Sequence, residues 1–357
     1  MNFSPELDLV VAAMRARFNP GADRTPAAPS SETVTAAMHI AVRNKLLLLL
    51  REPLQPMLTD EQSSYIDVYR FQTMQMNSTI MRESAALSKA LLEHNVGFIF
   101  IKGPIQQKYI YDDFFSRPCS DIDILAKSSD YSKIYDVISS IGYQTTSSSL
   151  WWRVFLGEQH LTKSGPPPVT VDLHYRIQQP GSPAPRSTQS YLARPDRTSV
   201  LGMPLEHLAA EDIPVLSAIS IVKGLFNRES VGAHVADLYA CVTPDVPQQL
   251  NTFLTIAAAQ NLRGTALLAL RIVSEVFGVK YHLAEEIGAM LPAVSGPDLV
   301  RMALTPTDPN LVWPKRREVL WHLCLKRPGR YAREIARAMA SEAALRLFER
   351  PETPAKP

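Results

Sequence analysis

The stretch Asp121-Ile122-Asp123-Ile124-Leu125 constrains the fold of this chain more than any other. In a β-strand alternate side chains share a face, so Asp121 and Asp123 would project to one side and the isoleucines to the other. Such a strand needs an apolar core on one face and an open polar site on the other. Two neighbouring carboxylates repel each other unless a cation lies between them. The pair therefore predicts a divalent metal site, with Mg²⁺ the usual ion in phosphate chemistry.

A second strand with the same pattern is expected at 169–177, VTVDLHYRI. Asp172, His174 and Arg176 would share one face of it, because they are two residues apart. If this strand lies beside the first, three carboxylates converge on one polar face. Three carboxylates can hold two Mg²⁺ ions, and Asp172 could also act as the general base for an acceptor hydroxyl.

The segment just before the first strand has the features of a phosphate site. The β-rich run 98–101 ends at Lys102-Gly103-Pro104, and a short helix is expected at 106–111. Free backbone N–H groups at a turn and helix start attract anions. Lys102 adds a positive charge to them.

The order of the expected elements is β-α-β-α-β-β, which predicts the α+β class: a small mixed sheet with flanking helical regions. The expected strands of this core lie at 98–101, 121–126, 154–162 and 169–177. The predicted organisation is an N-terminal helical region 1–95, a mixed-sheet core 96–180, a linker or mobile loop 181–203, a C-terminal helical domain 204–345 and a disordered tail 346–357.

Composition excludes several classes of protein. A net charge of +2 over 357 residues argues against a generic nucleic-acid binder. Three widely spaced cysteines predict neither a disulfide framework nor a zinc knuckle, and fit a reducing compartment. The longest apolar run, 46–50, is too short to span a membrane, and the N-terminus does not resemble a signal peptide. We therefore expect a cytoplasmic protein without a membrane partner.

The motifs together match a known family. The pattern of strand, Lys-Gly turn, helix, loop and Arg-x-x-Ser-Asp-Ile-Asp-Ile-Leu, followed later by Val-Asp-Leu-His-Tyr-Arg, resembles the polymerase-β-like nucleotidyltransferases. It is most similar to the branch labelled "uncharacterised nucleotidyltransferase", over about residues 75–240. Many members of the wider superfamily carry Gly-Ser at the phosphate turn, where this chain has Lys102-Gly103-Pro104. The resemblance therefore leaves the details of phosphate binding and the nucleotide preference open.

The resemblance implies a role for several residues. The metal ligands would be Asp121, Asp123 and Asp172, and the nucleotide phosphates would bind at Lys102 and Gly103.

Arg117 matches an arginine usual just ahead of the acids, where it would help to hold the triphosphate. The alternative for Arg117 is a salt bridge to Asp112 or Asp113. His160 and His174 match histidines around the strand of the third acid, and His174 could orient Asp172 or touch the substrate. The alternative for His174 is a half-buried, hydrogen-bonded histidine.

The following helical region offers further candidates. Lys223 or Arg228 could bind the triphosphate, although a solvated helix face explains them equally well. Asp237 resembles a family aspartate that could be structural. Trp151 and Trp152 could pack under the sheet or line an acceptor pocket.

The segment 315–337 carries eight basic residues with aromatic residues between them. It could contact a nucleic acid or an acidic peptide. An amphipathic helix pair with a basic outer face is the alternative that the pattern favours.

The implied activity is Mg²⁺-dependent transfer of a nucleoside monophosphate from an NTP, such as ATP, to an acceptor, with release of pyrophosphate. Two alternatives remain: a catalytically silent nucleotide-binding regulatory module, or a toxin-like enzyme that modifies RNA. The acceptor could be a small molecule, a peptide or protein, or RNA. Neither the preferred base nor the oligomeric state can be read from the sequence.

Overall fold

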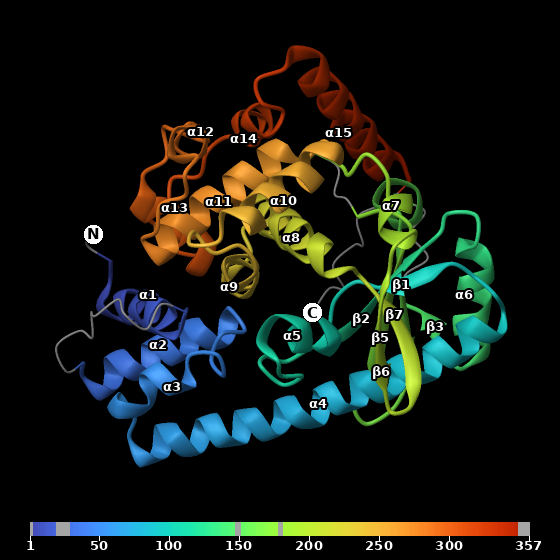
Figure 1. Cartoon of the computed structure of the whole chain (residues 1–357), viewed down its shortest axis with the longest axis horizontal. Helices are drawn as coiled ribbons and strands as arrows, with labels where there is room; N and C mark the ends of the chain where they lie inside the picture. The colour runs from blue at the N-terminus through green and yellow to red at the C-terminus, as the bar shows by residue number, and fades with distance from the viewer. Residues whose placement is uncertain (1–2, 19–28, 147–150, 178–180, 349–357) are drawn as a thin grey trace, which may run out of the picture.

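The computed structural model describes residues 3–18, 29–146, 151–177 and 181–348 (Figure 1). It confirms the α+β class, with a seven-stranded mixed sheet and helices around it. None of the helices within these ranges is long and apolar enough to cross a bilayer. The expected disordered tail lies, from residue 349 onward, outside the described residues.

Helices dominate both ends of the chain. The first group is α1 (Pro5–Phe18), α2 (Ser31–Arg43), α3 (Arg51–Leu54) and α4 (Asp60–Glu93). The last group is α8 (Ile213–Asn227), α9 (Gly232–Cys241), α10 (Pro247–Ala259), α11 (Arg263–Phe277), α12 (Ala284–Gly288), α13 (Gly296–Leu304), α14 (Arg316–Leu323) and α15 (Pro328–Phe348). Residues from α1 and α2, such as Met14 and Ala37, belong to the same buried cluster as Ile221 of α8 and Leu268 of α11. The two helical regions therefore share one hydrophobic core, on one side of the sheet (Figure 1).

The sheet lies beside this helical body and places the predicted strands side by side (Figure 1). Its strands are β1 (Phe98–Phe100), β2 (Asp121–Ala126), β3 (Gln144–Thr145), β4 (Glu158–Lys163), β5 (Val169–His174), β6 (Asp196–Val200) and β7 (Met203–His207), in the order β3-β4-β5-β2-β1-β7-β6. Strand β2 is antiparallel to β1 and parallel to β5. The short helices α5 (Pro104–Tyr111), α6 (Tyr131–Ser140) and α7 (Gln189–Leu192) connect the strands.

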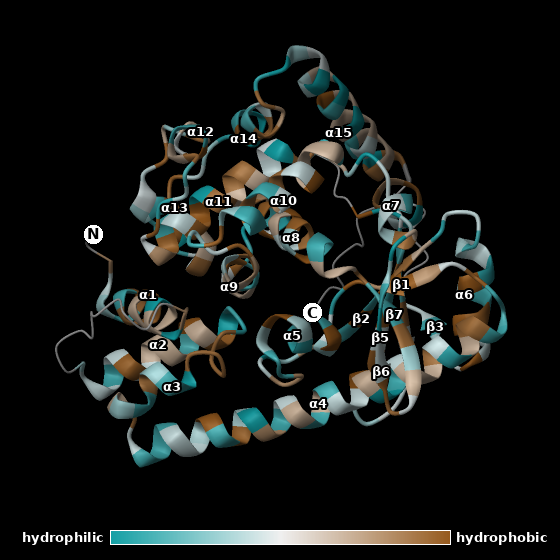
Figure 2. Cartoon of the chain, in the orientation of Figure 1, coloured by the Kyte–Doolittle hydropathy of each residue, from teal (hydrophilic) through white to brown (hydrophobic). Residues whose placement is uncertain are grey.

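The two faces of the central strands differ as their alternation predicts. Ile122, Ile124, Val171 and Leu173 are buried in a cluster that includes residues of α4 and α6, such as Leu87. Figure 2 shows the hydrophobic residues that run along the strands of the sheet. The acids occupy the opposite face, because they alternate with these buried residues.

One part of the predicted organisation is wrong. The segment 181–203 is not only a linker: it contains α7 and β6, and the region expected to be helical from 204 begins within β7. Strands β6 and β7 form an antiparallel hairpin around Leu201 and Gly202, which both have positive φ (53° and 77°). Val200 and Leu205 bury their side chains in the sheet core. An edge hairpin needs few apolar residues, so its Pro, Ser and Arg content was misleading.

The strand expected at 154–162 is also displaced. Residues Trp152–Leu156 form a wide helical turn, and β4 starts only at Glu158. Gly157 lies between them with φ of 68°, a conformation that glycine adopts at little cost. Gly157 therefore ends the helical turn and starts the strand.

Helix α4 links the N-terminal helices to the sheet (Figure 1). Its Asn77 is fully buried and holds the loop that leads to Asp121. The Asn77 side-chain amide donates to the carbonyl oxygens of Phe114 (2.7 Å) and Arg117 (2.9 Å), and its oxygen accepts from the backbone N–H of Cys119 (2.9 Å). One side chain thereby fixes three backbone groups just ahead of the acids.

We predict that Asn77→Ala lowers the free energy of unfolding by roughly 2 kcal/mol or more, because it leaves buried backbone groups without partners at about 1–3 kcal/mol each. Urea unfolding followed by circular dichroism measures this. Asn251→Ala, at an exposed position of α10, is the matched control and should change stability by less than about 0.5 kcal/mol. Equal losses in the two variants would contradict the role of Asn77.

Candidate active site

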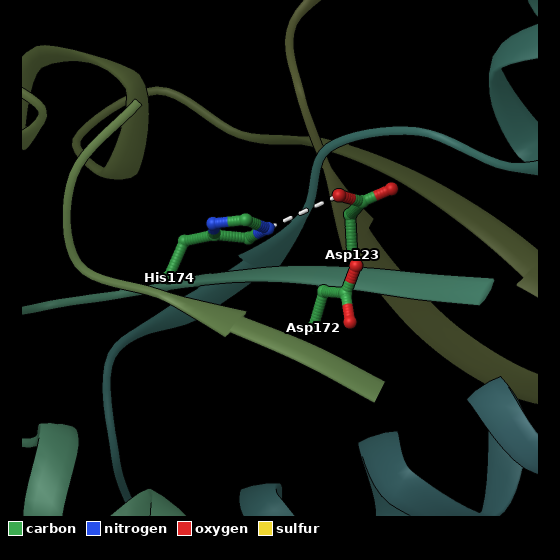
Figure 3. Close-up of side chains that lie close together, drawn as sticks. All are labelled: Asp123, Asp172 and His174. Atoms are coloured by element: carbon green, nitrogen blue, oxygen red, sulfur yellow. Dashed lines mark hydrogen bonds and ion pairs between the residues drawn. The ribbon is translucent and has the colours of Figure 1, made fainter. Parts of the chain in front are cut away.

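The three predicted acids lie on one face of two paired strands. The parallel register of β2 and β5 places Asp123 opposite Asp172 and Asp121 opposite Thr170. One ligand atom from each of Asp123, Asp172 and His174 lies within 4.8 Å of the others (Figure 3). Asp121 is outside this group but shares its face, two residues before Asp123. The polar face therefore concentrates the carboxylates as the sequence predicts.

Asp123 and Asp121 differ in their electrostatic surroundings. Burial alone would raise the pKa of Asp123, but the Lys102 ammonium (3.4 Å) and His174 (Nε2 to Oδ1, 3.1 Å) hold that pKa well below its ordinary value. Burial raises the pKa of Asp121, and the charges of Asp123 and Asp172 raise it further. The ionised form of Asp123 is thus stabilised by its surroundings, whereas the ionised form of Asp121 is repelled by the neighbouring carboxylates. A cation between them would relieve this repulsion.

Strand β4 adds a second row to the same face. The Nδ1 of His160 donates to Oδ1 of Asp172 at 2.5 Å, and this hydrogen bond raises the pKa of His160. Glu158 lies 3.6 Å from Nδ1 of His174 and 3.5 Å from Nε2 of His160. Sequence reasoning missed Glu158, although its place two residues before His160 puts it on the same face. Both histidines thus bond to carboxylates and fix their orientation.

The donor set fits a hard divalent cation. Asp121, Asp123 and Asp172 offer carboxylate oxygens, which are the ligands that Mg²⁺ prefers. His174 and His160 each bond through one ring nitrogen to one of these carboxylates, and so act as second-layer partners.

The Lys102-Gly103 turn lies beside the acids, as predicted. Attraction by Asp123 raises the pKa of Lys102, so its ammonium stays charged at neutral pH. Gly103 directly precedes helix α5 with φ of 95°, and a Cβ placed on it would meet nothing within 4 Å. The backbone of the turn is therefore open to a ligand on this side.

The turn and two of the acids line a cavity of about 260 Å³. Its walls also come from segments outside the sheet. The lining residues are Arg43, Asn44, Lys45, Lys102, Gly103, Arg117, Pro118, Cys119, Asp121, Asp123, Ser230, Ala233 and His234. No local motif marks Arg43, Lys45 or His234, because only the tertiary fold brings them here. Burial keeps the pKa of His234 well below its ordinary value, and nearby cations lower it further, so this side chain is neutral.

Arg117 lines the cavity but is also part of a buried ion pair. Its Nη1 lies 2.6 Å from Oδ1 of Asp237, which also accepts from the Tyr111 hydroxyl at 2.7 Å. The partner proposed from the sequence, Asp112 or Asp113, is wrong, because the guanidinium turns inward to helix α9. Asp237 therefore has a structural role, and Arg117 joins the loop before the acids to the helical domain.

The two basic candidates of the helical domain, Lys223 and Arg228, lie in different places. Lys223 is exposed on α8 and close enough to His160 to oppose its protonation electrostatically. Arg228 lies over the ring of Trp313 at 5.4 Å, in a different part of the helical domain, and does not line the cavity. Only Lys223 is placed near the acidic face.

The neighbouring tryptophans take different positions. The ring of Trp152 meets that of His160 edge to face at 4.8 Å, so Trp152 lies beside the polar face. The indole N–H of Trp151 donates to the carbonyl oxygen of Ser341 on α15 at 3.0 Å. Trp152 therefore lies next to His160, and Trp151 anchors this turn to the C-terminal helix.

The basic segment 315–337 forms α14 and the first half of α15, which confirms the helix pair. Arg316 donates to the carbonyl oxygen of Phe226, and Arg337 pairs with Glu334 at 3.0 Å. Some basic side chains of this segment are thus hydrogen-bonded or ion-paired within the protein. A contact with nucleic acid stays a prediction.

Comparison with known proteins agrees with this geometry. A search of curated proteins found no match to the chain. A family model described as "Uncharacterised nucleotidyltransferase" matches residues 30–278, which cover α2 through α11 and every candidate residue named for the cavity and the acidic face. Because the match spans more than half of the chain, the protein belongs to this nucleotidyltransferase family.

Proposed function

We propose that the protein transfers a nucleoside monophosphate from an NTP to an acceptor in a Mg²⁺-dependent reaction that releases pyrophosphate. The observation that carries this proposal is the row of Asp121, Asp123 and Asp172 on one face, beside a cavity with a lysine-glycine turn. Membership of a nucleotidyltransferase family supports the reaction type.

Each residue has a role that follows from its surroundings. Bound Mg²⁺ would neutralise phosphate charge and favour in-line displacement at the α-phosphorus. Asp123 is held as a carboxylate without a metal, and a metal ion held by Asp121 and Asp123 would supply the counter-charge that Asp121 needs. Lys102 and the open backbone at Gly103 hold phosphate oxygens of the donor.

The order of residues across the sheet gives the reaction a direction. Lys102 and the cavity lie on the β1 side of Asp123, whereas Asp172, His160 and Trp152 lie on the β4 side. In an in-line displacement the attacking oxygen and the leaving group lie on opposite sides of the phosphorus. The triphosphate thus belongs in the cavity, and the acceptor approaches from the β4 side.

The bond changes follow from this arrangement. The acceptor oxygen forms a bond to the α-phosphorus as the bond from that phosphorus to the bridging oxygen breaks, and pyrophosphate leaves on the cavity side. Asp172 is placed to take the proton of the acceptor hydroxyl, with His160 holding its carboxylate at 2.5 Å.

We predict that Asp121→Asn and Asp123→Asn each weaken Mg²⁺-dependent NTP binding and lower pyrophosphate release by about 100-fold or more, because each removes a metal ligand. Calorimetry with Mg·ATP and a pyrophosphate assay with labelled NTPs and candidate acceptors measure the two effects. Asp136→Asn, at an exposed position of α6, is the control and should behave like wild type.

Three observations would revise the proposal. Unchanged Mg·NTP binding in both variants would contradict the metal site. Tight NTP binding by wild type without pyrophosphate release, across all acceptors tested, would instead indicate a silent regulatory module. Co-purifying RNA that accepts the label would identify the RNA-modifying alternative.

We also predict that Asp121→Asn raises the melting temperature of the metal-free protein. The substitution removes a charge that burial, Asp123 and Asp172 all disfavour. Mg²⁺ should raise the melting temperature of wild type and have little effect on the variant. Differential scanning calorimetry with and without Mg²⁺ tests this, with Asp136→Asn again as the control. A metal-free variant less stable than wild type would show that the repulsion at Asp121 is unimportant.

A further inference from the structure

We propose that Arg43 and Lys45, which lie outside the sheet at the end of α2, bind the β- and γ-phosphates of the donor triphosphate. This inference rests on the proposed function and adds the residues that select a polyphosphate. Both residues line the cavity that also contains Lys102, Asp121 and Asp123.

The charges around the cavity are unevenly compensated. Lys102 pairs with Asp123, and Arg117 pairs with Asp237. Arg43 and Lys45 are exposed, and no acidic side chain in the described ranges forms an ion pair with either one. Two cations that form no direct ion pair therefore border a polar cavity next to a metal-type site, and the more distant charge of Asp121 is the acid that Lys45 acts on. A chain of phosphates is the ligand that supplies the missing negative charge.

The backbone that carries these side chains is firmly held. Asn44 is buried between them, and its amide donates to the carbonyl oxygens of Ile40 (2.9 Å) and Leu304 (2.8 Å). Its side-chain oxygen accepts from the backbone N–H of Gly232 at 2.9 Å, at the start of α9. A Cβ on Gly232 would lie only 2.6 Å from that oxygen, so the close approach requires glycine. Arg43 and Lys45 are thus presented from a rigid junction of both helical regions.

Lys45 itself has an uncommon conformation. Its φ is 56°, in the left-handed region that side chains other than glycine, asparagine and aspartate rarely adopt. Directly after it, Leu46 and Leu47 are fully buried and fix the chain direction. The conformation closes helix α2: the Lys45 N–H donates to the carbonyl oxygen of Val42 (2.9 Å) and the Leu46 N–H to that of Ala41 (2.8 Å). This helix end fixes the place from which the Lys45 side chain reaches the cavity.

A structural explanation covers only part of this observation. Basic residues at a helix C-terminus interact favourably with the last carbonyl groups, and Arg43 is in the last turn of α2. The same helix end sets the backbone of Lys45, since its N–H donates to the carbonyl oxygen of Val42. It does not require a cationic side chain at either position, whereas a polyphosphate in the cavity that both residues line does.

The test compares ligands that differ in their phosphates. Lys45→Gly removes the ammonium at a position whose φ suits glycine, so the fold should persist. We expect Lys45→Gly and Arg43→Ala each to weaken binding of Mg·ATP and of inorganic tripolyphosphate by about 10-fold or more, with AMP binding unchanged. Calorimetry measures all three, and Lys45→Arg should restore most of the affinity.

A surface lysine provides the control for these variants. Lys89→Ala removes an exposed lysine of α4 that does not line the cavity, and should leave all affinities as in wild type. Equal affinity of wild type and Lys45→Gly for tripolyphosphate, or no tripolyphosphate binding by wild type, would overturn the inference. An equal loss of AMP binding would overturn it too, because it would indicate a structural role.

Failure of the inference can be told apart from failure of the proposed function. If Asp123→Asn loses Mg·ATP binding while Lys45→Gly retains it, the metal site is supported and the phosphate role of Lys45 is contradicted. If Lys45→Gly loses tripolyphosphate binding while Asp123→Asn binds Mg·ATP normally, Lys45 binds polyphosphate but the proposed metal site is contradicted.

Discussion

The repulsion among Asp121, Asp123 and Asp172 is the constraint on which the rest of the structure depends. Parallel pairing of β2 and β5 forces Asp123 and Asp172 side by side. Three features compensate for this proximity: the buried isoleucine and leucine side chains on the other face, the Lys102 ammonium, and the histidines bonded to the carboxylates. Lys102 and Lys45 attract the charge at Asp121, but burial and the charges of Asp123 and Asp172 outweigh them and keep its pKa raised, which leaves the site in need of a cation.

Helix α9 connects the loop before the acids to the N-terminal helical region. Its Asp237 holds Arg117 of the loop before the acids, and its first residue, Gly232, holds Asn44 of the N-terminal region. The N-terminal and C-terminal helices also share one hydrophobic core. The cavity walls are therefore parts of a single packed body, and the geometry of the cavity depends on contacts far from the catalytic strands.

Local patterns in the sequence predicted much of the fold and the composition of the acidic face. Alternation alone put Asp121, Asp123 and Asp172 on polar faces, and their neighbours in the core, because a strand has a period of two. The β6–β7 hairpin was missed because one buried apolar side chain per strand leaves little signal. The pairing of Arg117 with Asp237, 120 residues away, and the place of Lys45 in the cavity depend on helix packing that no local pattern encodes.

The most direct test of the account is a crystal structure of the protein with Mg²⁺ and a non-hydrolysable NTP. The account predicts metal ions bound by Asp121, Asp123 and Asp172, with the triphosphate in the cavity beside Lys102 and Gly103. The β4 side, next to His160, should stay open for an acceptor. A nucleotide bound elsewhere, with no metal on these three carboxylates, would contradict the central claim that their convergence forms the nucleotidyl-transfer site.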